Sequence, residues 1–138
     1  MNIFISCGKK KRECACRAID MYIGNYFKAE AEAAKALGGR IWILSAKYGL
    51  LSPNDVITPY NLRLTWLNAK QRKIWADNVV KQMEQAGIDF NEQAIFLCGN
   101  DYSKLLVNYF PNKKTLTARN MSNRIAKLKQ ITNRKEQQ

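Results

Sequence analysis

The sequence contains no histidine, few acidic residues and no long apolar run. Without histidine, Ser-His-Asp and Cys-His catalysis are excluded, so acid–base chemistry would fall to Asp, Glu, Lys, Tyr or Cys. No stretch approaches the roughly 18 consecutive apolar residues of a membrane span. The apolar stretch at the N-terminus is short and its charges come after it, unlike a signal peptide. We therefore expect a cytoplasmic protein that makes no contact with membranes and keeps its cysteines reduced.

The charge balance is strongly basic, because 23 lysines and arginines stand against 11 acidic residues, a net charge of +12. A surplus of this size attracts polyanions, with an affinity that falls as the salt concentration rises. The alternative is a basic surface that serves solubility alone. We favour nucleic acid, either DNA or RNA, or a nucleotide as the partner.

Short apolar runs alternate with helical segments along the chain. Strands are predicted at Asn2–Ser6, Arg40–Ser45, Ala94–Cys98 and Lys114–Ala118. Helices are predicted from about Asn25 to Gly38, from Asn68 to Gly87, and over residues 101–110 and 119–133. Residues 46–66 contain two prolines and a glycine and are predicted to be irregular. The alternation predicts an α/β fold with a mostly parallel sheet.

No linker, repeat or low-complexity segment divides the chain, so residues 1–138 are predicted to form a single α/β domain. Its core would span about residues 1–118, followed by a basic helix at 119–133 and a frayed end at 134–138. From Lys113 to Lys135 the chain carries basic residues and no acidic one. A basic helix of this kind is typical of a clamp for phosphates, and its candidate nucleic-acid contacts are Arg119, Arg124 and Lys127.

Three of the predicted strands end in similar turns, SCGKKK, SAKYGLL and CGND. In parallel sheets, ligands bind beyond the carboxyl ends of the strands, so we expect these turns to form one site. Lysine ammonium groups at this edge suit phosphate oxygens, and Lys11 and Arg12 would extend the contact to nucleic acid. The candidate substrate- or phosphate-binding residues in these turns are Ser6, Cys7, Gly8, Lys9, Lys10, Ser45, Lys47, Tyr48, Gly49, Gly99 and Asn100.

Aromatic residues add to the candidate site. Tyr48 and Tyr60 fall in predicted turns near lysines, where an exposed ring can stack on a base. For Tyr22, Tyr26 and Tyr102 the alternative is core packing with a hydrogen-bonded hydroxyl, and we favour it for Tyr26.

The four cysteines are Cys7, Cys14, Cys16 and Cys98. Their spacing matches no common zinc pattern, and no histidine is present to complete one. Cys7 and Cys98 both end predicted strands, where a small buried residue is common. We therefore expect no metal ion and no other cofactor.

Five segments of the sequence resemble a small bacterial and phage domain family of unknown function: ISCGKKK, MYIGNYF, ILSAKYGLL, ITPYNLRL and CGNDYSKLL. That family is related to YaaA, the peroxide-stress proteins, and more remotely to the uracil-DNA glycosylase fold. The resemblance covers about Ile3 to Leu106. It implies a three-layer α/β/α sandwich around a central, mostly parallel four-stranded sheet.

The resemblance also implies which residues form the site. The matching positions are Ser6, Cys7, Lys9, Lys10, Tyr22, Ser45, Lys47, Tyr48, Gly49, Tyr60, Gly99 and Tyr102. The family usually follows its Pro-Tyr pair with an aspartate, whereas this chain has Asn61. If that carboxylate is catalytic in the family, Asp101 or Asp55 must replace it here, or the site only binds.

These residues fit functions of different classes. The first is a DNA glycosylase-like hydrolase, in which a carboxylate stabilises the positively charged sugar and lysines hold phosphate while a base is flipped out. Asp101 and Asn61 are its catalytic candidates, because either could position a water molecule. The second is a nucleic-acid- or nucleotide-binding protein without turnover, which Asn61 favours. The third is an inhibitor whose basic surface binds an acidic partner protein.

Overall fold

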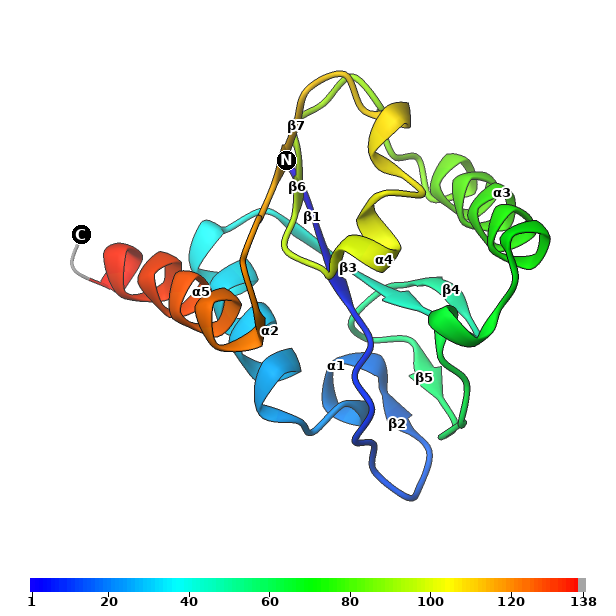
Figure 1. Ribbon diagram of the computed structural model, residues 1–138, viewed down its shortest axis with the longest axis horizontal. Coiled ribbons are helices and arrows are strands. Elements are labelled where there is room, and N and C mark those ends of the chain that lie inside the picture. Colours follow the sequence, from blue (N-terminus) through cyan, green and yellow to red (C-terminus); the bar gives the residue numbers. More distant parts are fainter. Residues whose placement is uncertain (137–138) are drawn as a thin grey trace.

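The computed structural model describes residues 1–136, with helices on both faces of a central sheet (Figure 1). The sheet has five strands in the order β4-β3-β1-β6-β7. These strands are β1 (Asn2–Ser6), β3 (Arg40–Ser45), β4 (Gly49–Leu51), β6 (Ala94–Phe96) and β7 (Lys113–Thr115). All neighbours pair in parallel except β3 and β4, which are antiparallel. The fold is α/β with a mixed, mostly parallel sheet, and the predicted count of four strands is one too few.

The other elements of the described chain, residues 1–136, are five helices, two short 3-10 turns and a small second sheet. The helices are α1 (Ala18–Met21), α2 (Asn25–Leu37), α3 (Ala69–Gln85), α4 (Asn100–Ser103) and α5 (Met121–Glu136). The 3-10 turns are η1 (Leu64–Trp66) and η2 (Val107–Tyr109), and β2 (Cys16–Arg17) pairs with β5 (Val56–Ile57) in antiparallel fashion. Across residues 1–136, every helix is too short or too polar to cross a bilayer.

The two faces of the sheet carry separate apolar clusters, which follow from the alternation of side chains along a strand. In β1, Phe4 packs in the cluster that contains Trp75, Val79 and Met83 of α3. Ile3 and Ile5 of the same strand belong to the cluster that contains residues of α2 and α5. Helices α2 and α5 lie side by side on that face (Figure 1).

Helix boundaries follow local capping chemistry where the sequence supplies it. Helix α3 begins after Asn68, whose side chain accepts from the backbone N–H of Gln71 while the Gln71 side chain accepts from that of Asn68. Helix α2 ends at Gly38, which has a φ of 77°.

Two predicted helices differ from the observed ones. The helix predicted over residues 101–110 is broken into α4 and η2. The basic helix predicted at 119–133 is α5, which continues through Glu136. The last two residues of the predicted frayed end, 137–138, lie outside the described residues.

The segment predicted to be irregular contains β4, β5 and η1. Gly49 starts β4 with a φ of 75°, which lets the chain reverse direction after β3. Gln82 of α3 fixes this reversal, because its amide donates to the Tyr48 carbonyl at 3.0 Å and accepts from the Leu50 N–H at 2.9 Å. Gly49 therefore has a structural role in joining the sheet to α3.

Gly49→Ala should destabilise the protein more than Gly38→Ala. Both glycines have positive φ, so each alanine costs about 1–2 kcal/mol of unfolding free energy from backbone strain. A Cβ at Gly49 would also lie 2.2 Å from Oε1 of Gln82, whereas one at Gly38 meets nothing within 4 Å. Urea unfolding of the two variants measures the difference. Equal losses of unfolding free energy would show that the Gln82 side chain can move away from the new Cβ without destabilising the protein.

Candidate functional site

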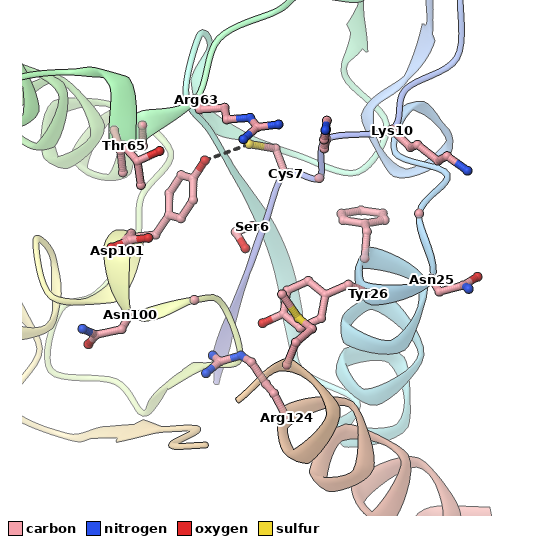
Figure 2. Close-up of a pocket in the computed structure, with 18 of the residues that line it drawn as sticks. Ser6, Cys7, Lys10, Asn25, Tyr26, Arg63, Thr65, Asn100, Asp101 and Arg124 are labelled. Atoms are coloured by element: carbon pink, nitrogen blue, oxygen red, sulfur yellow. Dashed lines mark hydrogen bonds between the residues drawn. The ribbon is translucent and has the colours of Figure 1, made fainter. Parts of the chain in front are cut away.

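A pocket of about 640 Å³ lies at the carboxyl edge of β1 and β6 (Figure 2). Its walls come from residues 6–11 after β1, residues 99–102 after β6, and residues 61–65 leading into η1. The first turn of α2 and the start of α5 complete it. Segments far apart in the sequence therefore meet at the edge where parallel strands place ligands.

Many of the sequence-predicted site residues line this pocket. They are Ser6, Cys7, Gly8, Lys9, Lys10, Lys11, Asn61, Gly99, Asn100, Asp101, Tyr102 and Arg124. Asp101 is the one carboxylate among the lining residues. The other carboxylate considered, Asp55, lies elsewhere and accepts from the Ser52 N–H at 2.8 Å.

The turn after β3 does not join this pocket. Lys47, Tyr48 and Gly49 line a separate depression with residues of α3. The physical reason is that β3 turns back at once into antiparallel β4, so the turn packs against Gln82 of α3. The predicted convergence of all three strand-end turns therefore holds for β1 and β6 and not for β3.

Three predicted nucleic-acid contacts also lie outside the pocket lining. Arg12 donates from Nε to the Asp20 carbonyl at 2.8 Å. Lys127 donates to the Thr117 carbonyl at 2.6 Å, and Arg119 is exposed just before α5.

Ser45 and Tyr60 do not line the pocket and belong to a hydrogen-bonded group with Tyr22. The Tyr60 hydroxyl lies 2.7 Å from Oγ of Ser45 and 2.8 Å from the Tyr22 hydroxyl. Burial raises the pKa of Tyr22 to about 12, and burial together with the nearby Cys7 and Tyr22 raises the pKa of Tyr60 far above its usual range. The Lys11 Nζ lies 4.5 Å from the centre of the Tyr60 ring, so this ring supports Lys11 and is not free to stack on a base.

Cys7 and Tyr102 join the two strand ends across the pocket floor. The Cys7 Sγ lies 3.0 Å from the Tyr102 hydroxyl, as the dashed line in Figure 2 shows. The Tyr102 ring packs edge-on against Trp75 of α3, with centroids 5.7 Å apart. Burial raises the pKa of Tyr102, so its hydroxyl stays protonated at neutral pH.

Arg124 was predicted to contact nucleic acid, but in the structure its guanidinium binds backbone carbonyls of the protein. It is buried, and its guanidinium donates to the carbonyls of Leu97 at 2.9 Å, Leu116 at 3.2 Å and Cys98. Its charge is therefore used to hold the start of α5 against the end of β6. A basic residue on an amphipathic helix gives no sequence signal that separates this role from phosphate binding.

Glu30 of α2 was not among the candidate residues, yet it lies directly behind the pocket floor. Its side chain is fully buried, and Oε1 accepts from the Ser6 N–H at 3.3 Å and from the Ser6 hydroxyl at 3.5 Å. Among the side chains of residues 1–134 and the described backbone, its Oε2 has no hydrogen-bond partner. Burial raises the pKa of Glu30 well above its usual value. Its burial could have been predicted from the helical spacing, because Glu30 lies on the same face of α2 as the apolar residues Phe27 and Ala34.

Other lining residues were also absent from the candidate set. Arg63 and Thr65 come from the segment before α3, and Asn25 and Tyr26 come from the first turn of α2. Tyr26 is half-buried and lines the pocket, in addition to the core packing expected of it. Figure 2 shows Tyr26 and Asn25 on the opposite wall from Asp101 and Thr65.

The sequence matches a family of unknown function, DUF6884, over residues 3–133, which include every segment of the pocket. The chain belongs to this family.

Relatives support the predicted relation to YaaA. The chain is 31% identical over 108 residues to the uncharacterized protein YfjM of Bacillus subtilis, covering 74% of this chain and 71% of that protein. It is 31% identical over 110 residues to a UPF0246 protein of Psychrobacter sp., covering 72% of this chain and 39% of the relative. A UPF0246 protein of Psychrobacter cryohalolentis is 26% identical over 107 residues. The chain thus spans about two fifths of the UPF0246 proteins.

Glu30→Gln should change how stability depends on pH. Because the pKa of Glu30 is raised in the folded state, the native protein binds more protons than the unfolded chain above the usual glutamate pKa of about 4.3. The wild type should therefore lose stability as pH rises from that value through the folded-state pKa, by up to about 1.4 kcal/mol per pH unit. The glutamine variant lacks this loss.

Urea unfolding between pH 4 and 8 measures both curves. Glu32→Gln is the matched control, because Glu32 is exposed on the same helix and its loss should leave the wild-type slope intact. Parallel curves for wild type and Glu30→Gln would contradict the raised pKa.

Proposed function

We propose that the protein binds one nucleotide of a nucleic-acid strand in the pocket of Figure 2 and hydrolyses its N-glycosidic bond. The observation that carries the proposal is the position of Asp101 as the one carboxylate in a pocket whose lining includes cations, amides and aromatic rings. The pocket volume of about 640 Å³ falls in the range of small-molecule sites, about 300–1,000 Å³. It can therefore enclose a base with its sugar.

The phosphate groups would bind at the cationic wall. Lys9 and Lys10 are exposed and line the pocket. Arg63 also lines it and appears next to Cys7 in Figure 2. The first turn of α2 faces the same space, without a side-chain cap on its backbone N–H groups. A helix N-terminus favours anions, so it adds to the attraction from the lysines.

The base would bind between the aromatic and amide groups. Tyr26 and Phe27 line one wall, and Asn61 and Asn100 offer amide donors and acceptors for a base edge. A base inside a duplex must leave the stack to reach such a pocket, at a cost of a few kcal/mol. Single-stranded or mismatched nucleic acid lowers that cost and is the favoured substrate.

Asp101 supplies the chemistry. Breaking an N-glycosidic bond builds positive charge on the sugar, which a nearby carboxylate stabilises. Asp101 is exposed in the pocket wall, and its partner Lys104 lies at a long 3.9 Å, so the carboxylate remains accessible. Asn61 also lines the pocket, and its amide would orient the attacking water.

Binding without turnover is the second candidate function. Asn61 lines the pocket at the position where the family usually has aspartate, which leaves Asp101 without a second carboxylate among the lining residues. Nucleic-acid binding with no released base would favour this function. An absence of binding at low salt would favour the acidic partner protein instead.

Asp101→Asn should lower base release by about 10²–10³-fold while leaving binding largely intact, because the amide keeps the shape and loses the charge. The assay is mass spectrometry of free bases after incubation with single- and double-stranded DNA and RNA, including modified bases. Asp77→Asn is the control, since Asp77 lies on α3 outside this pocket. Unchanged base release by Asp101→Asn would show that Asp101 takes no part in the reaction.

Lys9→Ala combined with Lys10→Ala should weaken nucleic-acid binding and make its salt dependence shallower. Each lost phosphate contact removes about 0.7 (single strand) to 0.9 (duplex) from the slope of log K against log salt, so the expected change for two lysines is roughly 1–2. Fluorescence anisotropy with a labelled oligonucleotide measures it. Lys35→Ala combined with Lys70→Ala removes the same charge from exposed positions outside the pocket. An equal change in slope for both pairs would mean that the pocket is not the binding site.

A further inference from the structure

The three lysines after β1 occupy different environments. Lys9 and Lys10 are exposed, whereas Lys11 is half-buried in the pocket wall. The backbone holds Lys11 in place through a bridge to Tyr22, flanked by hydrogen bonds from Arg12 N to Met21 O and from Ile23 N to Lys10 O. The backbone at Lys11 is therefore held in place at the pocket wall.

The ammonium group of Lys11 stands apart from the described carboxylates. Among the side chains of residues 1–134 no carboxylate lies within salt-bridge distance of it, and its hydrogen bond to the Lys9 carbonyl is long, at 3.4 Å. Its Nζ instead lies 4.5 Å from the centre of the Tyr60 ring and 5.9 Å from that of Tyr22. Two ring faces position the amine at the pocket.

Burial is the main cause that lowers the pKa of Lys11; the nearby Cys7 opposes this effect, and the Arg63 guanidinium adds to it. Desolvation and a neighbouring cation are the two conditions that turn a lysine into an amine nucleophile, because both disfavour its protonated form. Lysines in such settings form Schiff bases with carbonyl compounds.

We propose that Lys11 is a covalent catalytic residue that forms an imine with the C1′ aldehyde of an abasic sugar in the pocket. This proposal rests on the proposed function, because release of a base by hydrolysis leaves a sugar whose ring opens to that aldehyde. The inference names the substrate class that follows base release, an aldehydic abasic site in nucleic acid. It also assigns a role to the one lysine of the run that is not exposed.

The step balances without an oxidant or reductant. The neutral amine of Lys11 adds to C1′ and forms the C–N bond. The carbonyl oxygen then leaves as water with the two amine protons, and the C=N bond forms. Addition of water reverses the reaction and frees Lys11. The faces of Tyr60 and Tyr22 stabilise the cation when this imine is protonated.

Reductive trapping tests the proposal. The full chain is incubated with a single-stranded oligonucleotide that carries one aldehydic abasic site, together with sodium cyanoborohydride, which reduces the imine to a stable amine. We expect a crosslinked species on a denaturing gel. Tandem mass spectrometry of the wild-type product should place the adduct on Lys11, so the result does not depend on a variant that folds.

Variants and a second oligonucleotide separate the outcomes. Lys11→Arg keeps the charge and should lose the crosslink, whereas Lys28→Arg, at an exposed position on α2 outside the pocket, should keep it. An oligonucleotide with a tetrahydrofuran analogue has no aldehyde and reports binding alone. Binding of the analogue without a crosslink, or adducts spread over other lysines, would overturn the role of Lys11 and leave the proposed function standing. Failure to bind either oligonucleotide would overturn both.

Discussion

The central position of β1 governs the rest of the molecule. All five residues of this strand are buried, and it pairs in parallel with β3 on one side and β6 on the other. Parallel strands end at the same edge of a sheet, so the chain that leaves β1 must meet the chain that leaves β6. This constraint brings residues 6–11 and 99–102 to one pocket, although more than 80 residues of sequence separate them.

Two buried polar side chains attach the surrounding helices to this edge. Glu30 connects α2 to Ser6 at the end of β1, and Arg124 connects α5 to Leu97 and Cys98 at the end of β6. Each leaves one buried atom without a partner among the described residues, Glu30 Oε2 and Arg124 Nε. A buried polar atom without a protein partner costs stability unless a water molecule, an ion or a ligand completes its hydrogen bonding. Arg124 lines the pocket and Glu30 contacts Ser6, which also lines it, so both atoms lie close to this space.

The sequence was informative where one short-range pattern determined the structure. The apolar runs at residues 2–6 and 40–45 predicted two strands, and the helix predicted from Asn68 to Gly87 is the one that packs Trp75, Val79 and Met83 into the core. The strand β4 was not predictable in the same way, because its pairing depends on Gly49 and on Gln82, which lies 33 residues further on. The same missing contact explains why Lys47 was predicted to join the pocket.

The charge of side chains was a weaker guide than their surroundings. Arg124 and Lys127 are both basic residues of α5, yet one is buried under three backbone carbonyls and the other lies outside the pocket. The burial of Glu30 was not predicted, because a helix rich in alanine, glutamate and lysine normally exposes its charged side chains. Burial of a charged group depends on which face of a helix meets the sheet, and that is settled only by the tertiary structure.

The run of three lysines shows how this affects function. Lys10 and Lys11 both line the pocket, but they differ in exposure. Lys10 is exposed, and an exposed ammonium group attracts phosphate and releases counterions when it binds. Lys11 is half-buried against the rings of Tyr22 and Tyr60, where an amine loses hydration and its neutral, nucleophilic form is favoured. Adjacent lysines can therefore serve different functions, one attracting nucleic acid and the other forming a covalent bond, because one is exposed to water and the other is half-buried against aromatic rings.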